Sequence, residues 1–170
     1  MAEGPAGGGT SSIGEAFATA DLYDDHGDAL QSCSLQLRSI GGAARFQGGI
    51  STVRCHRDNA LVKAALAEPG EGRVLVVDGG GSLESALVGD LIGASAVENG
   101  WAGVVVNGAV RDTVALGQLP LGVRALGSNP RKSAKDGVGD RGVPVAFGGV
   151  EFVPGAHLWA DEDGILVTRP

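Results

Sequence analysis

VGDLIGASAVENGWAGVVVNGAVRD, residues 88–112, is the stretch around which the rest of the chain is organised. The pair Gly89-Asp90 opens an apolar run with helical character, and Asn99-Gly100 stops it. A short β-rich segment at residues 103–106 follows, and the adjacent pair Arg111-Asp112 closes the stretch. The other segments are expected to form a scaffold that brings the two ends of this stretch together.

The composition indicates one globular domain with few aromatic side chains. At 170 residues the chain is long enough to bury a core. Hydrophobic residues make up 43% of the chain and aromatic residues only 4%, so valine, leucine, isoleucine and alanine must build that core. Residues 1–12 are rich in glycine, alanine and serine and are predicted to be a disordered extension. Residues 13–170 are predicted to form the single domain.

The charge and the cysteines restrict the partners and the compartment. A net charge of −7 argues against nucleic acid, because phosphate binding relies on patches of lysine and arginine, and the cluster Arg131-Lys132 with Lys135 is too short to form one. No apolar run is long enough to span a membrane, and the N-terminus lacks the features of a signal peptide. Cys33 and Cys55 are isolated and favour buried thiols over a disulfide. The protein is therefore predicted to be cytoplasmic, with neither nucleic acid nor membrane as a partner.

The order of the predicted elements indicates an α/β fold. Helices are predicted at residues 19–27, 59–68, 90–99 and 113–119, with a helical turn at 83–87. Strands are predicted at residues 35–40, 50–55, 73–77, 103–106 and 123–126, and two hairpins at 143–152 and 158–168 close the chain. The run RVLVV at 73–77 is typical of a strand buried on both faces, and Asn107-Gly108 is expected to end the next buried strand. This order predicts a single α/β domain with a mixed sheet and flanking helices.

Gly89-Asp90 is the first candidate for a binding site. A glycine just before a helix lets another group approach the backbone, and the first free N–H groups of the helix attract an anion. A small carboxylate or phosphate would fit there. The alternative is that Asp90 is only the N-cap of the helix, and this pair alone favours that alternative.

Arg111-Asp112 is the second candidate. The pair follows a buried strand, at the edge of the sheet where α/β proteins usually place their ligands. Arg111 could bind a carboxylate or a carbonyl oxygen with two hydrogen bonds. Asp112 supplies the hard oxygen ligands that Mg²⁺ and Mn²⁺ prefer. An aspartate that starts a helix beside a solvated arginine is equally compatible with this pair alone.

The other motifs favour structural roles. The glycine-rich loop at residues 78–81 lacks the spacing of a dinucleotide or Walker loop, so a turn between a strand and a helix is favoured over a nucleotide site. His26, His56 and His157 lie far apart in sequence, without the spacing of metal ligands. No lysine lies near the 88–112 stretch in the sequence.

Several ordered segments beyond residue 18 resemble one known family. They are TADLYD at 19–24, VDGGGSLESALVGD at 77–90, WAGVVVNGAVRD at 101–112, ALGSNPRKS at 125–133, FGGVEFVP at 147–154 and ADEDG at 160–164. Together they resemble the family called regulator of ribonuclease activity A (RraA-like), which includes the 4-hydroxy-4-methyl-2-oxoglutarate aldolases. The resemblance implies a swivelling β/β/α fold and a homotrimer with sites near the subunit interfaces.

The resemblance also assigns roles to residues of the 88–112 stretch. The aldolases share an aspartate that is followed, after twenty residues, by Arg-Asp, and Asp90 with Arg111-Asp112 reproduces that spacing. By resemblance these three residues are catalytic, Asp112 binds a divalent cation, Mg²⁺ or Mn²⁺, and Asp90 acts through a metal-bound water. The implied substrate-binding residues are Gly89, Asp90, Leu91, Ile92 and Arg111, largely through backbone N–H groups on the pyruvyl carboxylate. Some active members carry an acid where this chain has Ala115, and that departure bears on rate and preferred substrate.

Two functions from different classes follow from the resemblance. The first is a metal-dependent lyase that cleaves 4-hydroxy-4-methyl-2-oxoglutarate to pyruvate and decarboxylates oxaloacetate through the same pyruvate enolate, with no lysine Schiff base. The alternative is a protein-binding regulator that inhibits an RNase E-type ribonuclease without catalysis, to which an acidic surface is suited. A third interpretation, methyl transfer from S-adenosylmethionine to a quinone, is disfavoured because the loop at 78–81 is its only candidate cofactor loop.

Overall fold

The structure, a computed structural model, describes residues 16–170, so the extension predicted at residues 1–12 lies outside the described residues. The helices are α1 (Thr19–His26), α2 (Ala60–Leu66), α3 (Asp90–Glu98) and α4 (Thr113–Leu116), and a 3₁₀ turn η1 (Gly27–Ala29) follows α1. The strands are β1 (Leu30–Ser32), β2 (Arg38–Ser39), β3 (Phe46–Arg54), β4 (Val74–Asp78), β5 (Ala86–Val88), β6 (Gly103–Val110), β7 (Gly122–Ser128), β8 (Asp140–Arg141), β9 (Val145–Phe147), β10 (Val150–Phe152), β11 (His157–Asp161) and β12 (Gly164–Thr168).

One mixed sheet contains ten of these strands, in the order β1-β12-β11-β3-β4-β6-β7-β2 with β5 beside β6 and β8 beside β3. Its centre is parallel, because β3, β4, β6 and β7 run in one direction. The strands β11, β12 and β1 extend it in antiparallel pairing. As the RVLVV pattern predicts, β4 has strand neighbours on both sides and Val74–Val77 are buried. The prediction of a single domain with a mixed sheet and flanking helices is confirmed.

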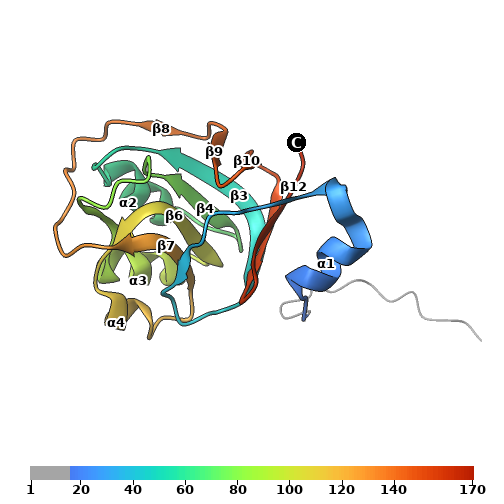
Figure 1. Cartoon of the computed structure of the whole chain (residues 1–170). Helices are drawn as coiled ribbons and strands as arrows, with labels where there is room; N and C mark the ends of the chain where they lie inside the picture. The colour runs from blue at the N-terminus through green and yellow to red at the C-terminus, as the bar shows by residue number, and fades with distance from the viewer. Residues whose placement is uncertain (1–15) are drawn as a thin grey trace, which may run out of the picture.

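The parallel part of the sheet separates two hydrophobic cores, and the antiparallel part forms a layer of its own, so the molecule has three layers. On one face of the parallel strands, α2 and α3 enclose a core that includes Leu66, Leu75 and Val104 (Figure 1). On the other face, the C-terminal antiparallel strands enclose a core around Val76 and Phe152. Helices, parallel strands and antiparallel strands thus follow one another in the β/β/α order that the resemblance implies.

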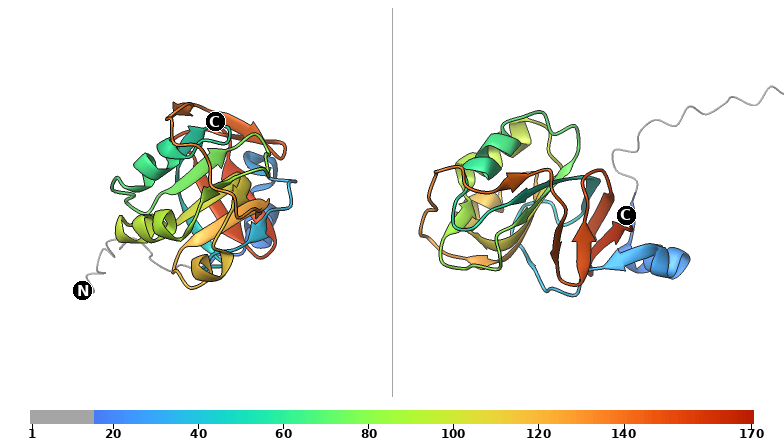
Figure 2. Two further views of the ribbon diagram at one scale, coloured as in Figure 1. Left: turned by 90° about the vertical axis from the view of Figure 1, so that its left-hand side faces the viewer. Right: turned by 90° about the horizontal axis from the view of Figure 1, so that it is seen from above.

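Helix α1 lies to one side of these layers, beyond β12 (Figures 1 and 2). Its first residue, Thr19, donates from its backbone N–H and its hydroxyl to the buried Asp161 carboxylate, at 2.7 Å each. Burial alone would raise the pKa of Asp161, but these bonds and one from the Asp163 N–H outweigh burial and lower the pKa. The helix begins at Thr19, but the expectation that Thr19 is its N-cap is wrong: Ala18 is the N-cap, and the threonine side chain anchors the helix to β11.

The helical turn predicted at residues 83–87 is wrong, because this segment leads into the strand β5. The partner of β5 is the far half of β6, where Ala86 lies opposite Ala109 and Val88 opposite Val110. For the same reason the predicted stop at Asn107-Gly108 is wrong, and β6 continues to Val110. The first half of β6 pairs with β4 and the second half with β5, so neither boundary could be found from local sequence.

The half-buried strand predicted at residues 35–40 is mostly a loop. Only Arg38 and Ser39 pair with β7, and the missed strand β1 lies earlier, beside β12. The apolar residues that produced the alternation pack outside a ladder: Leu37 joins the second core, and Leu35 lies against Gly148 of the β9–β10 turn. The alternation of apolar and polar residues at 35–40 therefore arises from the packing of a loop on a hairpin, not from a strand.

Two further predictions concern the cysteines and the possibility of a membrane span. Cys33 and Cys55 are free thiols, as predicted, but only Cys55 is buried, whereas Cys33 is partly exposed. Burial raises the pKa of Cys55 to about 12. Within residues 16–170, the helices are all too short or too polar to cross a membrane. The cytoplasmic location remains a prediction.

Candidate functional site

Three parallel strands end at the same edge of the sheet and place the candidate residues. Strand β5 ends at Val88, next to Gly89-Asp90, and β6 ends at Val110, next to Arg111-Asp112. The two ends are joined because the Arg111 N–H donates to the Val88 carbonyl at 2.9 Å. Strand β7 ends beside them, and the Asn129 N–H donates to the Val110 carbonyl at 3.0 Å. The two ends of the 88–112 stretch therefore meet, at the edge where α/β sheets usually bind ligands.

A second contact between these ends is a hydrogen bond from the backbone of Asp90 to the side chain of Asp112. The Asp90 N–H donates to Asp112 Oδ2 at 3.0 Å. Asp112 has left-handed backbone angles, φ 56° and ψ 44°, and although it precedes α4 its side chain makes no cap bond. Such a conformation costs free energy in a non-glycine residue and is retained where the surrounding structure or function requires it.

Gly89 is needed because the Asp112 carboxylate lies directly against it. A Cβ at position 89 would lie 2.7 Å from Asp112 Oδ2 and 3.4 Å from the Arg111 side chain. Gly89 is also the N-cap of α3, so the alternative that Asp90 is the N-cap is wrong. The glycine thus admits both charged side chains to the beginning of the helix, as its position before the apolar run suggested.

The predicted backbone donors at the beginning of α3 already hold carboxylates. The Leu91 N–H donates to Oδ1 of Asp90 at 2.8 Å, and the Asp90 N–H is bonded to Asp112. Two of the N–H groups that the resemblance assigns to a substrate carboxylate are therefore occupied by side-chain carboxylates. This arrangement demonstrates that the helix start accepts anions, and it means that a substrate must displace Asp90 to reach the Leu91 N–H.

Arg111 lies between two hollows at this edge. Its Nη1 donates to the Pro130 carbonyl at 3.4 Å, and its Nε is 3.9 Å from Asp112 Oδ2. The side chain is 43% exposed, so guanidinium donors remain for a ligand. On one side lies a hollow of about 260 Å³ with Asp112 and Asn129, and on the other a pocket of about 220 Å³. We call the second the Arg111 pocket; it is lined by Asn59, Lys63, Ala86, Gly89, Asp90, Leu91, Ile92, Arg111, Lys132 and Lys135.

All predicted substrate-binding residues, Gly89, Asp90, Leu91, Ile92 and Arg111, line the Arg111 pocket. The expectation that no lysine lies near the motif is wrong in space, because Lys63, Lys132 and Lys135 complete the lining. Sequence reasoning missed them because they come from α2 and from the segment after β7, each more than 15 residues from the 88–112 stretch. All three lysines are exposed, whereas a lysine that forms a Schiff base is normally desolvated.

The donor set around Asp112 fits a hard divalent cation that keeps most of its water. Within residues 16–170, no three His, Cys, Asp or Glu side chains gather as a complete protein-derived metal site. Asp112 is 37% exposed and one of its oxygens accepts the bond from Asp90. Mg²⁺ is commonly held by one or two carboxylates together with water and substrate oxygens. Asp112 would hold such a cation, and Asp90 lies beside it.

The glycine-rich loop at residues 78–81 and His157 make internal hydrogen bonds. In the loop after β4, the Gly79 and Gly81 N–H groups donate to the Asn107 carbonyl at 3.0 and 3.1 Å, and the Gly80 N–H donates to Asp78 Oδ1 at 2.9 Å. The loop is a turn between two strands, not the predicted strand-to-helix turn, and its backbone donors are used internally. His157 is half-buried and bonds Gln47 at 3.0 Å, and burial lowers its pKa.

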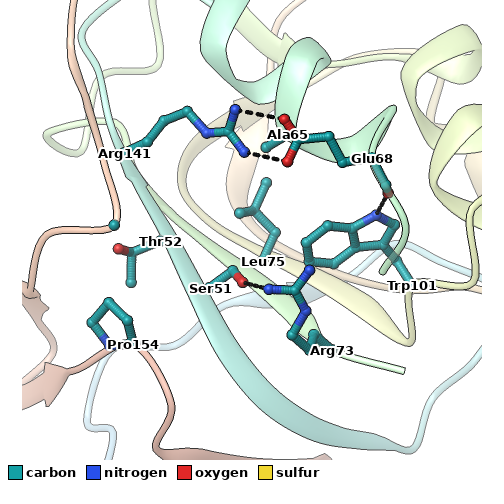
Figure 3. A pocket seen from close by; sticks show the side chains of 10 residues that line it. Ser51, Thr52, Ala65, Glu68, Arg73, Leu75, Trp101, Arg141 and Pro154 are labelled. Carbon is teal, nitrogen blue, oxygen red and sulfur yellow. Dashed lines mark hydrogen bonds and ion pairs between the residues drawn. The ribbon is translucent and has the colours of Figure 1, made fainter. Parts of the chain in front are cut away.

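A second pocket, which we call the Trp101 pocket, lies on another part of the surface and has a volume of about 310 Å³. It is lined by Ser51, Thr52, Ala65, Glu68, Arg73, Leu75, Trp101, Arg141, Gly142 and Pro154. Figure 3 shows the Arg141 guanidinium facing the Glu68 carboxylate, with bonds of 3.0 and 2.8 Å. Arg73 bonds the Ser51 hydroxyl and two backbone carbonyls, and its guanidinium lies 5.0 Å from the Trp101 ring. Arg141 and Glu68 are thus paired with each other, and all three nitrogens of the Arg73 guanidinium have neutral hydrogen-bond partners.

Known proteins resemble the chain over nearly its whole described length. The family model RraA-like, described as Aldolase/RraA, matches residues 19–167. A Laribacter hongkongensis protein named "Putative 4-hydroxy-4-methyl-2-oxoglutarate aldolase" is 58% identical over 152 residues, which is 89% of this chain and 96% of that protein.

Two solved structures share the fold. One is described as S-adenosylmethionine: 2-dimethylmenaquinone methyltransferase from Geobacillus kaustophilus, with a TM-score of 0.88, 47% identity, and coverage of 89% of this chain and 94% of that chain. The other is the RNA-processing inhibitor RraA of a Thermus species, with a TM-score of 0.87, 49% identity, and coverage of 90% and 93%. The three relatives carry three different functional names, so the site must decide among functions. On this sequence and structural similarity, the chain belongs to the RraA-like family.

Proposed function

We propose that the protein is a divalent-metal-dependent lyase that cleaves 4-hydroxy-4-methyl-2-oxoglutarate to pyruvate and also decarboxylates oxaloacetate. The observation that carries the proposal is the meeting of Gly89-Asp90 with Arg111-Asp112, where the Asp90 N–H donates to Asp112 Oδ2 at 3.0 Å. The name of the Laribacter hongkongensis relative, 58% identical, supports the same reaction. The internally bonded loop at residues 78–81 gives no comparable support to methyl transfer.

The chain's own groups can bind a 2-oxo acid at the beginning of α3. The carboxylate of the acid would replace the Asp90 carboxylate on the Leu91 N–H, because the same donor and the same helix dipole attract both. Arg111 would donate to the keto oxygen and stabilise the negative charge that develops there. Binding of the substrate would therefore release the Asp90 carboxylate for proton transfer.

The released carboxylate supplies the base that cleavage requires. Asp90 Oδ1 would accept the proton of the substrate hydroxyl as the C–C bond breaks, which releases one pyruvate and leaves the other as its enolate. The proton then returns to the enolate carbon, so atoms and charge balance. A divalent cation on Asp112 would supply Lewis-acid polarisation of the keto-acid oxygens when bound. Loss of CO₂ from oxaloacetate leaves the same enolate, which is why one site could serve both reactions.

Turnover of oxaloacetate tests this proposal. We expect pyruvate formation with Mg²⁺ or Mn²⁺, loss of activity with EDTA, and recovery when the metal is restored. Asp112→Asn should lower kcat/KM by about 1,000-fold, because a cation contributes several kcal/mol to the transition state, while Tm stays unchanged. Asp140→Asn is the matched control, since that exposed aspartate pairs with Arg54 on β3. Activity that survives EDTA, or that survives Asp112→Asn, would reject the metal-dependent scheme.

The homotrimer implied by the family is part of the same proposal. Leu91 at the start of α3 is 82% exposed and Val114 on α4 is 80% exposed, both beside the candidate site. Large apolar side chains at such exposure are suited to an interface between subunits. Light scattering should give a mass of three times 17.0 kDa, and Leu91→Asp should lower it.

A second candidate function, regulation of an RNase E-type nuclease, is favoured by the surface of α1. This helix carries exposed Asp21, Asp24 and Asp25 and lies to one side of the layers (Figure 2). An acidic helix of this kind could occupy a basic RNA-binding segment. A pull-down with such a nuclease should lose binding when the three aspartates become asparagine and keep it in Arg111→Ala. The reverse result would contradict a regulatory role for α1.

A further inference from the structure

The three lysines of the whole chain all line the Arg111 pocket. The sequence contains only Lys63, Lys132 and Lys135 against ten arginines, and each of the three contributes to this lining. The five ion pairs found within residues 16–170 all use arginine. The lysine ammonium groups are therefore concentrated at one pocket, and none has a carboxylate partner among the described residues.

The segment that carries two of these lysines is held by buried polar contacts. Asp58, which is 4% exposed, accepts backbone N–H bonds from Asp136, Gly137 and Val138 at 3.0 to 3.2 Å. Burial opposes the charge of Asp58, but these bonds and one from the Ala60 N–H outweigh it and lower the pKa. The carboxylate is thus ionised and fixes the backbone just beyond Lys135.

The lysine side of the pocket is joined directly to the strand that leads to Gly89. The buried Ser133 hydroxyl donates to the Ala86 carbonyl at 2.7 Å. The Lys135 Nζ donates to Asn59 Oδ1 at 3.1 Å, and the amide of Asn59 donates to the Leu87 carbonyl at 3.2 Å. The backbone that carries Lys132 and Lys135 consequently has a defined position relative to β5 and to the beginning of α3.

We propose that Lys63, Lys132 and Lys135 form a subsite for the second carboxylate of a dianionic 2-oxo acid and make the enzyme select such acids over monoanionic ones. The inference rests on the proposed function, which places the first carboxylate and the keto oxygen at the start of α3 and at Arg111. The second carboxylate of the same acid would then reach the lysines, which line the same pocket. A carboxylate is the anion that several mobile ammonium donors can bind without fixed bidentate geometry.

The subsite should affect the two proposed reactions differently. In aldol cleavage the distal carboxylate is retained in the second pyruvate, so its binding assists the reaction throughout. In oxaloacetate decarboxylation that carboxylate leaves as neutral CO₂, so ammonium groups that hold its charge stabilise the bound substrate more than the transition state. Removal of the lysines should therefore raise KM for oxaloacetate while kcat stays unchanged or rises.

The direct test compares two acids that the protein binds without cleavage. Calorimetry with Mg²⁺ should give a Kd at least tenfold lower for 2-oxoglutarate, a dianion, than for 2-oxobutyrate, a monoanion. Each lysine-to-methionine substitution should reduce the ratio of the two Kd values about fivefold, which is the effect expected of an exposed charge pair. The triple variant should show no preference for the dianion. Lys132→Arg, which keeps the charge, should retain the preference. Arg131→Met, an adjacent exposed residue outside this lining, is the matched control.

The outcomes separate the inference from the proposed function. A triple variant that folds and keeps the wild-type preference would overturn the subsite, even if oxaloacetate turnover is normal. A preference that disappears in the triple variant would support the subsite, and absence of oxaloacetate turnover in the wild type would then reject only the lyase. An equal Kd for the two acids in the wild type would also overturn the inference.

Discussion

The Arg111 pocket and the Trp101 pocket each contain arginine and a carboxylate, but only the Trp101 pocket pairs them closely. There Arg141 and Glu68 share bonds of 3.0 and 2.8 Å, and Arg73 has partners at all three nitrogens. In the Arg111 pocket the guanidinium lies 3.9 Å from Asp112, and the lysines have no ion pair among the described residues.

This difference distinguishes a pocket that holds the fold together from one that can bind a charged ligand. A charge already paired with a neighbour must give up that bond before it binds anything else, whereas an unpaired charge in a pocket attracts an opposite charge at once. The left-handed Asp112 lies beside the Arg111 pocket and makes its close approach at Gly89, which lines the pocket. Strain and unpaired charge occur together at the Arg111 pocket, as is common at functional sites.

Arg111→Lys is the substitution expected to show the largest difference in activity between the two pockets. Lysine keeps the charge but cannot make two parallel hydrogen bonds to a keto acid, and we expect kcat/KM for oxaloacetate to fall about 100-fold. Since the side chain is 43% exposed, Tm should not change. The matched substitution Arg141→Lys in the Trp101 pocket should leave kcat/KM as in the wild type. Equal losses in the two variants would show that the pockets do not differ in function.

The sequence predicts the centre of this fold because its signals there are local. The apolar run of β4, the helical spacing of α2 and α3, and the two C-terminal hairpins each lie within one continuous segment. The sequence does not predict strand β5, because three residues are too few to show a periodic pattern. The segment is a strand only because it pairs with β6. Likewise, Asp90 and Arg111-Asp112 could be proposed from spacing and family resemblance, whereas the lysines come together only through long-range contacts such as Asp136 with Asp58.

Asp58→Asn tests whether the Arg111 pocket depends on the buried scaffold beneath its lysines. The substitution removes the charge that accepts four backbone N–H groups, and its amide would point donors toward donors. We expect the free energy of unfolding at pH 7 to fall by about 2 kcal/mol, measured by urea denaturation. The preference for 2-oxoglutarate should weaken as well, because Lys135 loses its fixed backbone.

The contribution of Asp58 to the free energy of unfolding is expected to depend on pH. The pKa of Asp58 is lowered in the folded protein, so between that value and the ordinary aspartate pKa the unfolded chain binds more protons. The stability from Asp58 is therefore complete above pH ~4 and is lost as the pH falls through the folded pKa. The difference between wild type and Asp58→Asn should shrink in that acidic range. A difference that stays constant below pH ~4 would contradict the assignment.

Gly89→Ala should have a smaller effect, confined to the Arg111 pocket. Its backbone angles suit any residue, so the cost comes from the new Cβ, which would lie 2.7 Å from Asp112 Oδ2. The carboxylate can move aside by rotating, and we expect about a tenfold loss of kcat/KM with a loss of about 1 kcal/mol in stability. Gly49→Ala is the control, because its nearest contact would be an ordinary 3.8 Å. Full activity in Gly89→Ala would indicate that the position of Asp112 is not critical.

Glu68→Gln in the Trp101 pocket is expected to have the smallest effect of all. The bond from Arg141 lowers the pKa of Glu68, and Glu68 in turn raises the pKa of Arg141, so each charge stabilises the other. Both side chains are exposed, at 54% and 39%, and water screens the pair; glutamine also keeps one acceptor for the guanidinium. Tm should therefore shift by no more than ~2 °C, and oxaloacetate turnover and the preference for 2-oxoglutarate should match the wild type. A tenfold loss of turnover in this variant would mean that an internally paired pocket also takes part in catalysis, and the distinction between the two pockets would then be wrong.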